Sequence, residues 1–431
     1  MIEKLADFFR KYHFARQAYR IIKRIDFSYS IPQITPINIR KSGFDVNRIN
    51  LVIPSINREH FFGGVSTALS LFNALSTGSR GSIPSRIILT DAEPDEADLD
   101  KFDGYHLVSF EDDSDEIRQI VAVNNKFQKN LFVTSGDRFL STSWWTAYCA
   151  IQMIERQCIY YGPECNRMGY LIQDFEPGFY NWSTHYLLAE STYRSEVMTI
   201  PVFNSIFLRD YFKDQGYRFE KEFVFEPQLN PDLKRFMNST DRNAKDQRIL
   251  VYGRPSVERN CFPLIIEALK YWTTIQPDLN EWEVLSIGEA HKPIKLGNGK
   301  IMASLGKLSL EEYASLLNRS AVGLSLMVSP HPSYPPLEMA HFGILTITNS
   351  YANKNLSKCH ENILSLDRLT PRHIAEALLS RTTAFSLDRH IGEKGKSMIP
   401  HYDQEPMIFP FAGELLKILF DTSISSGKPN Q

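Results

Sequence analysis

The chain of 431 residues is long enough for two or three domains, and its 43% apolar and 23% charged residues are typical of a globular protein with an ample core. Its 48 Lys and Arg side chains nearly balance its 50 Asp and Glu side chains. This balance argues against nucleic acid as the main partner, because proteins that bind polyanions usually carry a basic excess. Five cysteines without a C-x-x-C spacing are expected to be reduced thiols of a cytoplasmic protein.

The first 25 residues follow a basic amphipathic pattern. MIEKLADFFRKYHFARQAYRIIKRI places Leu5, Phe8, Tyr12 and Ile22 on one helical face and carries seven Lys or Arg against two acids up to residue 24. Such a helix either lies on an anionic membrane surface, here the inner face of the cell membrane, or docks on its own protein. We expect a helical extension over residues 1–47 and no helix that spans a membrane, because no apolar run reaches roughly 18 residues.

From residue 48 the chain alternates between strand-like and helix-like segments. The strand-like segments are short, rich in β-branched or aromatic residues and apolar on both faces, as buried parallel strands are. Strands are predicted at residues 50–54, 86–90, 106–110, 130–135, 170–173, 197–202 and 222–225. Helices are predicted at residues 65–76, 143–157 and 205–215.

A polar segment, residues 231–246, predicts a linker, and the same alternation then begins again. Strands are predicted at residues 248–253, 283–288, 301–305, 322–327, 345–348 and 363–366. Helices are predicted at residues 261–272, 310–317, 336–341, 371–379 and 407–420. The pattern therefore predicts two doubly wound α/β domains, over 48–230 and 247–400, with a final helix in 401–431 that packs back on the first domain. Ligands of such sheets bind outside the carboxyl ends of the strands, so we expect a site between the domains.

A glycine pair, Gly63-Gly64, stands between the first strand and the helix that follows it. Glycines at this position either make a tight turn or let backbone N–H groups approach an anion at the helix N-terminus.

Two arginines flank the corresponding loop of the second domain. Arg254 follows the strand at residues 248–253, and Arg259 precedes the next helix. Two guanidinium groups that converge on a cleft suit a diphosphate, because each can bind two oxygens, although the same spacing also fits surface arginines with solvated head groups.

The segment VSPHPSYPPLEMAHFG, residues 328–343, joins a predicted strand to a predicted helix. Pro335 and Pro336 suit the first helical positions, where no N–H is required, and Glu338 is then expected in the first turn. A carboxylate there is either stabilised by the helix dipole or accepts hydrogen bonds from sugar hydroxyls in the cleft.

Taken in this order, these motifs resemble the retaining glycosyltransferases of family 4, which have the GT-B fold of two Rossmann-like domains. The resemblance covers roughly residues 48–400. It implies that Gly63 and Gly64 meet the phosphates and sugar of a nucleotide-sugar donor. It also implies that Gly253-Arg254-Pro-Ser-Val-Glu-Arg259, similar to the family's G-R-x-x-x-x-K/R pattern, binds the diphosphate.

The same resemblance assigns the nucleoside end of the site. The helix start Pro336-Leu337-Glu338-Met339-Ala340-His341-Phe342-Gly343 is similar to the family's P-L-E-A-M-A-x-G and implies that Glu338 binds the ribose. Residues 301–313 resemble the family's strand, turn and helix around the base. Backbone groups of four consecutive residues are expected near the base: Leu305, Gly306, Lys307 and Leu308.

The chain departs from the family at the sugar end. The family usually carries a second Glu eight residues before the helix Glu, and here Pro330 stands at that position, with His331 beside it. We expect His331, Tyr334 and Pro335 to border the donor sugar, with His331 offering a hydrogen-bond donor or acceptor. An exposed loop histidine is the alternative.

In the first domain, YLIQDFEPGFYNW at residues 170–182 places Asp174 and Glu176 among aromatic residues. This QDFEP form resembles a subgroup that contains bacterial rhamnosyltransferases of surface-glycan assembly. The resemblance implies that Asp174, Glu176 and His331 act at the reacting centre. Phe175, Tyr180 and Trp182 either stack on acceptor sugars or pack beneath the loop.

The resemblance implies a metal-independent enzyme without a cofactor that transfers a sugar with retention of anomeric configuration. The favoured donor is dTDP-L-rhamnose, with UDP- or GDP-sugars as alternatives, and the acceptor is expected to be a growing, lipid-linked glycan. The Asp-x-Asp pairs at Asp98–Asp100 and Asp113–Asp115 are expected to be solvated acids rather than metal ligands. Two alternatives stay open: a sugar-nucleotide epimerase or phosphorylase on the same fold, and a non-catalytic module that binds glycan or supports an assembly.

Overall fold

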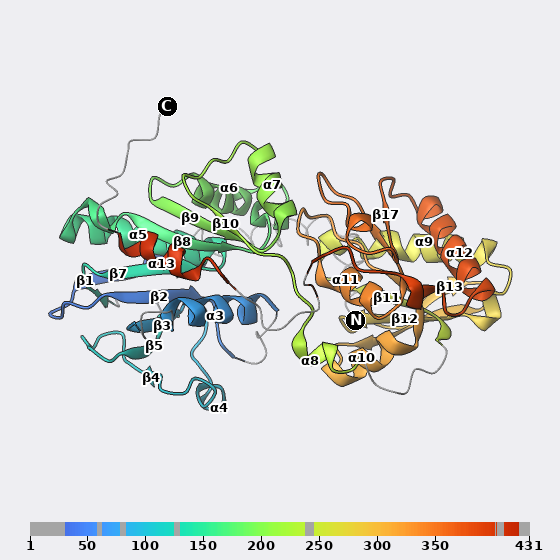
Figure 1. Ribbon diagram of the computed structural model, residues 1–431, viewed down its shortest axis with the longest axis horizontal. Coiled ribbons are helices and arrows are strands. Elements are labelled where there is room, and N and C mark those ends of the chain that lie inside the picture. The colour runs from blue at the N-terminus through green and yellow to red at the C-terminus, as the bar shows by residue number, and fades with distance from the viewer. Residues whose placement is uncertain are drawn as a thin grey trace, which may run out of the picture.

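The computed structural model describes residues 31–57, 63–77, 83–124, 130–237, 245–400, 402 and 409–421. The chain forms two α/β lobes that lie side by side (Figure 1). The amphipathic helix predicted for residues 1–25 lies outside the described residues, as do residues 238–244 of the predicted linker. The first part of that linker forms a short helix, α8 (Pro231–Lys234), whose N-cap Asn230 accepts hydrogen bonds from the N–H groups of Asp232 and Leu233.

The N-terminal lobe is built on an eight-stranded sheet in which every paired strand is parallel to its neighbour. The strand order is β10-β9-β8-β7-β2-β3-β5-β4, and a separate parallel pair joins β1 to β6. The bounds are β1 Asn38–Lys41, β2 Arg48–Ile53, β3 Ser85–Leu89, β4 His106–Leu107, β5 Arg118–Ala122, β6 Asn130–Val133, β7 Asp137–Ser141, β8 Arg167–Ile172, β9 Met198–Phe203 and β10 Phe223–Val224.

Helices cover both faces of this sheet, which is why its central strands are buried along their whole length. One face packs on α5 (Trp144–Tyr161) and α7 (Ile206–Asp214), and the other on α3 (Gly63–Ser76) and α13 (Ala412–Phe420). Two further helices belong to this lobe, α4 (Glu96–Leu99) and α6 (Thr184–Ser191).

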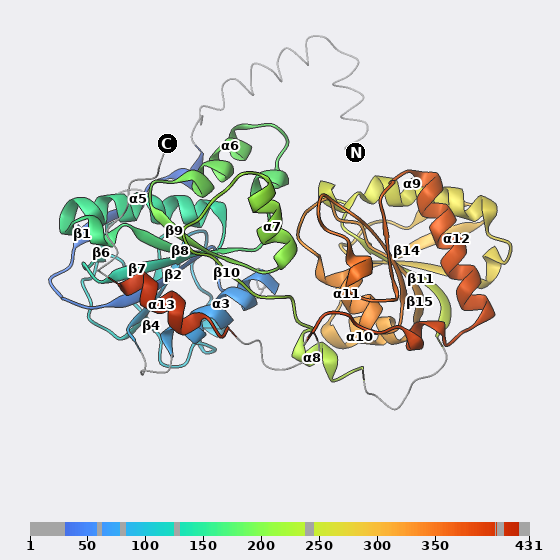
Figure 2. The same ribbon diagram turned by 45° about the horizontal axis from the view of Figure 1, so that its top comes forward.

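The helix α13 returns from the C-terminal end of the chain to the N-terminal lobe, where it lies beside α3 and β8 (Figures 1 and 2). Leu415 and Leu419 are fully buried in the cluster that also contains Leu69 of α3. At the helix C-terminus, Arg138 donates to the carbonyl of Leu419 at 2.8 Å and Arg167 to that of Ile418 at 2.8 Å. These guanidinium groups satisfy carbonyls that the helix itself leaves without partners, and they complement its dipole.

The C-terminal lobe has a seven-stranded sheet of order β13-β14-β12-β11-β15-β16-β17, parallel except for the β13–β14 hairpin. The strand bounds are β11 Asp246–Gly253, β12 Glu283–Gly288, β13 Ile294–Gly297, β14 Lys300–Gly306, β15 Ser320–Leu324, β16 Leu345–Asn349 and β17 Ile363–Leu366. Helices α9 (Phe262–Ile275) and α12 (Pro371–Leu387) cover one face, and α10 (Leu310–Arg319) and α11 (Tyr334–His341) the other. Together the lobes are the two doubly wound α/β domains expected from the sequence.

Several elements differ from the prediction. The strand predicted at 130–135 is β6, which pairs with β1 outside the main sheet. Strands β5 and β7 were not predicted, although β7 is a central strand. The helix predicted to begin at Pro336 begins at Tyr334, so Glu338 lies in its second turn rather than its first. Among the described residues, no helix is both long and apolar enough to cross a bilayer.

Candidate functional site

The strand order places the same kind of loop at the centre of each sheet. In the C-terminal lobe β11 lies between β12 and β15, and in the N-terminal lobe β2 lies between β3 and β7. These are the points at which the direction of strand order reverses, and open α/β sheets bind ligands outside the carboxyl ends of the strands there. The loops after β2, β11 and β15 carry the glycine pair, the two arginines and the proline-rich segment identified in the sequence.

A cavity of about 380 Å³, here called the β11 cavity, opens at the carboxyl ends of β11, β12 and β14. Gly306 has φ of +67°, which lets the chain turn from β14 toward α10 without Cβ strain. A Cβ on Gly253, at the end of β11, would lie 2.4 Å from the hydroxyl oxygen of Ser286, so glycine is required where the loop of Arg254 begins. Side chains and backbone that border the cavity include Arg254, Gly288, Glu289, Lys307, Leu308 and Tyr313.

Glu338 lies beside this cavity and is held by Tyr313. The hydroxyl of Tyr313 donates to Oε2 of Glu338 at 2.7 Å. Burial raises the pKa of Glu338 to about 6, although the hydrogen bond from Tyr313 lowers it. Arg254, which borders the same cavity, is in hydrogen-bonding contact with Tyr252. The cavity therefore has the guanidinium group of Arg254 on its border, and a carboxylate with a fixed partner lies beside it.

Asp174 connects the two lobes. Its Oδ1 accepts hydrogen bonds from the N–H of Phe175 at 2.8 Å and from the hydroxyl of Ser329 in the C-terminal lobe. Its Oδ2 lies 3.5 Å from a guanidinium nitrogen of Arg259, whose head group also stacks over the Phe179 ring at 3.9 Å. The structure thus brings Asp174 and Arg259, which the sequence placed in different domains, into one ion pair across the lobes.

His331 lies next to this contact and is buried. The N–H of Ser333 donates to Nδ1 of His331 at 3.0 Å, so the ring proton is on Nε2 when the imidazole is neutral. Burial lowers the pKa of His331 to about 4, even though the charge of Asp174 raises it. Ser333, which makes this contact, has φ of +67°, an unusual value for a residue with a side chain. His331 is therefore a neutral donor, and Nε2 has no hydrogen-bond partner among the described residues.

Glu176 is placed differently from Asp174. It is buried, and Oε2 accepts hydrogen bonds from the N–H of Trp144, the first residue of α5, and from the Tyr170 hydroxyl at 3.3 Å. Burial raises its pKa to about 8, against the hydrogen bond from Trp144. These contacts show Glu176 supporting the start of a helix, and both fall on Oε2 of the side chain that the resemblance placed at the reacting centre.

The three aromatic residues proposed to contact an acceptor have three different surroundings. Phe175 is buried among Tyr193, Tyr211, Phe212 and Tyr217, so its ring faces are used in the core. The hydroxyl of Tyr180 accepts a hydrogen bond from Nε1 of Trp144 at 2.9 Å.

Trp182, by contrast, is 93% exposed and stacks on Tyr186 with ring centroids 5.5 Å apart. Its outer face is therefore available to a ligand, whereas that of Phe175 is not.

The glycine pair begins α3, and Gly64 packs against a residue of the QDFEP segment. Nε2 of Gln173 donates to the carbonyl of Gly64 at 3.2 Å, and a Cβ on Gly64 would lie 3.1 Å from the same amide. Tyr334, at the start of α11, has a side-chain hydrogen bond with Thr67 of α3. Tyr334 thus joins α11 to the helix that follows the glycine pair, in the other lobe.

The Asp-x-Asp pairs do not form a cluster in the described part of the chain. Asp98 pairs with Lys101 at 2.7 Å, and Asp113 accepts hydrogen bonds from Ser42 and from the N–H of Gly43. No group of three or more His, Cys, Asp or Glu side chains within the described ranges is arranged to hold a metal ion.

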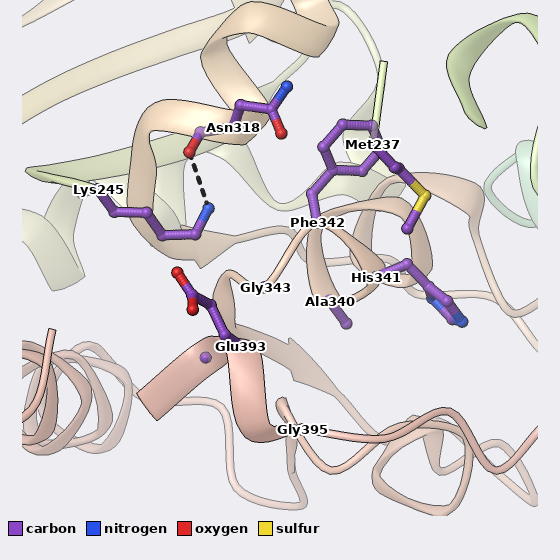
Figure 3. Close-up of a pocket in the computed structure, with 10 residues that line it drawn as sticks. Met237, Lys245, Asn318, Ala340, His341, Phe342, Gly343, Glu393 and Gly395 are labelled. Atoms are coloured by element: carbon purple, nitrogen blue, oxygen red, sulfur yellow. Dashed lines mark hydrogen bonds between the residues drawn. The ribbon is translucent and has the colours of Figure 1, made fainter. Parts of the chain in front are cut away.

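A second cavity, of about 120 Å³, lies at the C-terminal end of α11 and is lined by residues that include Lys245, Asn318, Gly343 and Glu393 (Figure 3). Nζ of Lys245 donates to the carbonyls of Leu317 at 3.0 Å and Asn318 at 3.2 Å, in the last turn of α10. The ammonium group therefore caps the C-terminus of α10, and this contact accounts for a positive charge at the cavity without any bound ligand.

Three residues at the site were not identified from the sequence: Tyr313, Ser329 and Lys354. Tyr313 lies one helical turn after the cap of α10, and its partner Glu338 is 25 residues away. Ser329 belongs to the proline-rich segment, where the prolines and His331 drew attention instead. Lys354 follows β16, so the rule that loops at carboxyl strand ends carry function could have found it.

Comparison with known proteins agrees with this geometry. The family described as "WsaF, N-terminal domain" matches residues 48–206, and "WsaF, C-terminal domain" matches residues 247–379. The "O-antigen biosynthesis protein RfbC" of Myxococcus xanthus is 30% identical over 257 residues, which are 59% of this chain and 19% of the relative. The chain thus spans about a fifth of the length of this relative.

Solved structures show the fold. Anabaena HepE in complex with UDP has a TM-score of 0.51 at 11% identity and covers 87% of this chain and 96% of its own. WaaG, described as a glycosyltransferase involved in lipopolysaccharide biosynthesis, has a TM-score of 0.52 at 12% identity and covers 86% of this chain and 99% of its own. With both WsaF domains matched in order over most of the two lobes, the chain belongs to the WsaF family and has the GT-B fold.

Proposed function

We propose that the chain is a glycosyltransferase of cell-surface glycan assembly that uses a nucleotide-sugar donor and retains the anomeric configuration. The observation that carries the proposal is the β11 cavity, which has Arg254 on its border and the Tyr313–Glu338 pair beside it, at the switch point of the C-terminal sheet. Such a cavity fits a nucleoside, with its ribose hydroxyls on Glu338 and its phosphates toward Arg254. Support comes from the WsaF domains, from the Myxococcus relative, which is described as an O-antigen biosynthesis protein, and from a GT-B neighbour solved with UDP.

In this proposal the C-terminal lobe performs electrostatic catalysis. Arg254 and Arg259 bind the diphosphate and stabilise the negative charge that develops as it leaves the sugar. His331, a neutral donor at Nε2, stands beside the position of the family's second carboxylate and donates a hydrogen bond to an oxygen of the donor sugar. Retention then requires no nucleophile from the protein, because the acceptor hydroxyl attacks the anomeric carbon from the face that the diphosphate leaves. No strong base is required either, because a phosphate oxygen of the leaving group can accept the proton of that hydroxyl.

The donor and acceptor are assigned from the likeness to bacterial rhamnosyltransferases. That likeness favours dTDP-L-rhamnose over UDP- and GDP-sugars, and a lipid-linked glycan as acceptor. Asp174, at the contact between the lobes, and the exposed face of Trp182 in the N-terminal lobe are proposed to bind the acceptor. Contact between the lobes would exclude water from the reaction and limit hydrolysis of the donor.

The proposal is tested by incubating the chain with dTDP-L-rhamnose, UDP-glucose or GDP-mannose in the presence of bacterial membrane glycolipids. We expect one donor to release its nucleoside diphosphate together with a glycosylated lipid whose new linkage has the donor's anomeric configuration by NMR. An inverted linkage would contradict retention. Turnover of none of these donors would favour the non-catalytic module.

The pH dependence of nucleotide affinity is expected to reflect the ionisation of the Glu338 carboxyl group. Its pKa of about 6 means that the carboxylate is ionised at pH 7 and protonated at pH 5, where it accepts hydrogen bonds from ribose hydroxyls less well. Affinity should therefore fall as pH decreases from 7 to 5. Because the terminal phosphate also titrates near pH 6 (roughly as a phosphomonoester does), the test is the difference between the profiles of wild type and Glu338→Gln. Parallel profiles would exclude Glu338 from ribose binding, and Glu376→Gln on the exposed face of α12 is the matched control.

Asp174 is expected to compete with a diphosphate for Arg259. Asp174→Asn removes the charge that lies 3.5 Å from the guanidinium group and keeps an acceptor for Ser329. We expect nucleoside diphosphate to bind about 2- to 5-fold more tightly, since a partly exposed ion pair contributes up to about 1 kcal/mol. Calorimetric titration measures the change, with Asp210→Asn, which removes an exposed ion pair with Arg209, as control. Weaker binding by Asp174→Asn would contradict competition.

A further inference from the structure

Lys354 is a buried basic residue at the carboxyl edge of the C-terminal sheet. It follows β16 and closes a tight turn in which Tyr351 and Lys354 exchange backbone hydrogen bonds of 3.0 and 2.8 Å. Its side chain is 1% exposed, and Nζ donates to the carbonyl of Met327, just after β15, at 2.9 Å. A buried ammonium group costs several kcal/mol unless it has partners, so its position requires an explanation.

The contact with Met327 does not supply that explanation. Asn349 already donates to the Met327 carbonyl at 3.0 Å and accepts from the Met327 N–H at 2.7 Å. The loop after β15 is therefore held without the lysine. An ammonium group has three donors, and within the described part of the chain no carboxylate lies within 4 Å of Nζ.

The surroundings of Lys354 belong to the proposed donor site. Val328, the residue after its partner Met327, donates its N–H to the carbonyl of Arg259 at 2.8 Å, so consecutive residues of one loop hold both basic residues. The same loop holds the other two groups, because the Ser329 hydroxyl donates to Oδ1 of Asp174 and accepts from the N–H of His331 at 3.0 Å. In keeping with this arrangement, the charge of Lys354 lowers the pKa of His331, and the charge of Asp174 raises the pKa of Lys354.

We propose that Lys354 is a third cation of the donor site and that its ammonium group binds the diphosphate at the end that carries the sugar, beside Arg259 and His331. This inference rests on the proposed function. It gives the buried ammonium group an anionic partner, and it adds positive charge where negative charge develops as the glycosidic bond to the phosphate breaks.

The lysine also gives the site a pH dependence. Burial lowers the pKa of Lys354 to about 8, against the charges of Asp174 in the N-terminal lobe and of Cys261 before α9, which raise it. The other charged or titratable groups that the adjoining loops place here are the guanidinium group of Arg259 and His331, whose pKa is lowered by burial to about 4. Because a diphosphate prefers the ammonium form, its affinity should fall as pH rises through 8.

The test is calorimetric titration of the full chain and its Lys354→Met and Lys354→Arg variants. The probes are whichever of dTDP, UDP and GDP binds the wild type, and the matching nucleoside monophosphate. We expect Lys354→Met to weaken diphosphate binding about 10-fold and monophosphate binding less than 2-fold, as loss of a charge-assisted contact to the second phosphate predicts. The control is Lys270→Met, on the exposed face of α9.

Between pH 7 and 9 the wild type should lose affinity for the diphosphate, whereas Lys354→Arg, which stays charged, should not. This arm decides the question if Lys354→Met fails to fold. Equal diphosphate affinity in wild type and folded Lys354→Met, or the same pH profile in wild type and Lys354→Arg, would overturn the inference while leaving the proposed function standing. A wild type that binds none of the three nucleotides would overturn both.

Discussion

Replacing Arg254 or Arg259 by alanine is expected to weaken the binding of a nucleoside diphosphate by about 10- to 100-fold. Each arginine stands at the carboxyl edge of the C-terminal sheet, Arg254 on the border of the β11 cavity and Arg259 beside Asp174. Hydrogen bonds to charged groups contribute about 1.5–3 kcal/mol each. Alanine removes both the charge and the hydrogen-bond donors of the guanidinium group, so this contribution to binding is lost. Calorimetric titration of the full chain measures the loss.

The control for these variants is Arg372→Ala. Arg372 lies on the exposed face of α12, where it pairs with Glu376 at 2.7 Å, so the same change in net charge occurs away from the cavity. The two site variants should differ in one respect. Arg254→Ala should weaken monophosphate and diphosphate binding, whereas Arg259→Ala, farther from the nucleoside, should act mainly on the diphosphate. If both variants bound the diphosphate as tightly as the wild type does, the assignment of these arginines to the binding site would be wrong.

The largest expected loss of stability is that of Asp137→Ala in the N-terminal lobe. Asp137 is buried at the start of β7, where it accepts hydrogen bonds from Arg48 at 2.9 Å, Asn50 at 2.9 Å and the N–H of Thr134 at 2.7 Å, and it lies 3.5 Å from Arg86. Burial raises its pKa, but Arg86 and Arg48 outweigh this effect, so the carboxyl pKa lies below its usual value. Alanine would leave two buried guanidinium groups facing each other.

We expect Asp137→Ala to lower the free energy of unfolding by about 3–5 kcal/mol, as removal of one partner from a buried ion pair does. The measurement is urea unfolding of the full chain, followed by far-UV circular dichroism. Asp232→Ala is the matched control, because its ion pair with Arg235 is exposed and should contribute under about 1 kcal/mol. A loss for Asp137→Ala no larger than that of the control would contradict this role of the cluster.

The same cluster shows why part of the fold could not be predicted from the sequence. Strand β7 begins with Asp137 and Arg138 after Gly136, a pattern typical of a turn, yet both side chains are buried by partners on other strands and on α13. The bounds of apolar strands such as β2, β11 and β12 were predicted to within one or two residues, because a strand that is buried on both faces has a continuous apolar run in its own sequence.

The candidate site divides in the same way. The sequence predicted that Arg254, Arg259 and Glu338 lie near a cleft, because each follows or precedes an element at the carboxyl edge of a sheet. It could not predict the bond between Tyr313 and Glu338 or the contact of Asp174 with Ser329, which join segments 25 and 155 residues apart. Nor could it separate Asp174 from Glu176, since the difference depends on where the N-terminus of α5 lies.

The departure at Pro330 and His331 also has a physical description now. His331 is not an exposed loop residue, because it is buried and its Nδ1 is occupied by the N–H of Ser333. A neutral imidazole that donates from Nε2 differs from the carboxylate of the family pattern, which accepts. Under the proposed function, the chain would therefore recognise a different feature of the donor sugar, an acceptor oxygen rather than a donating hydroxyl.

Calorimetric titration of the wild-type full chain with dTDP, UDP and GDP tests the proposed nucleotide site most directly. We predict saturable binding of one of the three at one site per chain, with dTDP favoured, and loss of that binding in the Arg254→Ala, Arg259→Ala double variant. Binding of none of the three nucleotides would contradict a nucleotide-sugar site in the β11 cavity.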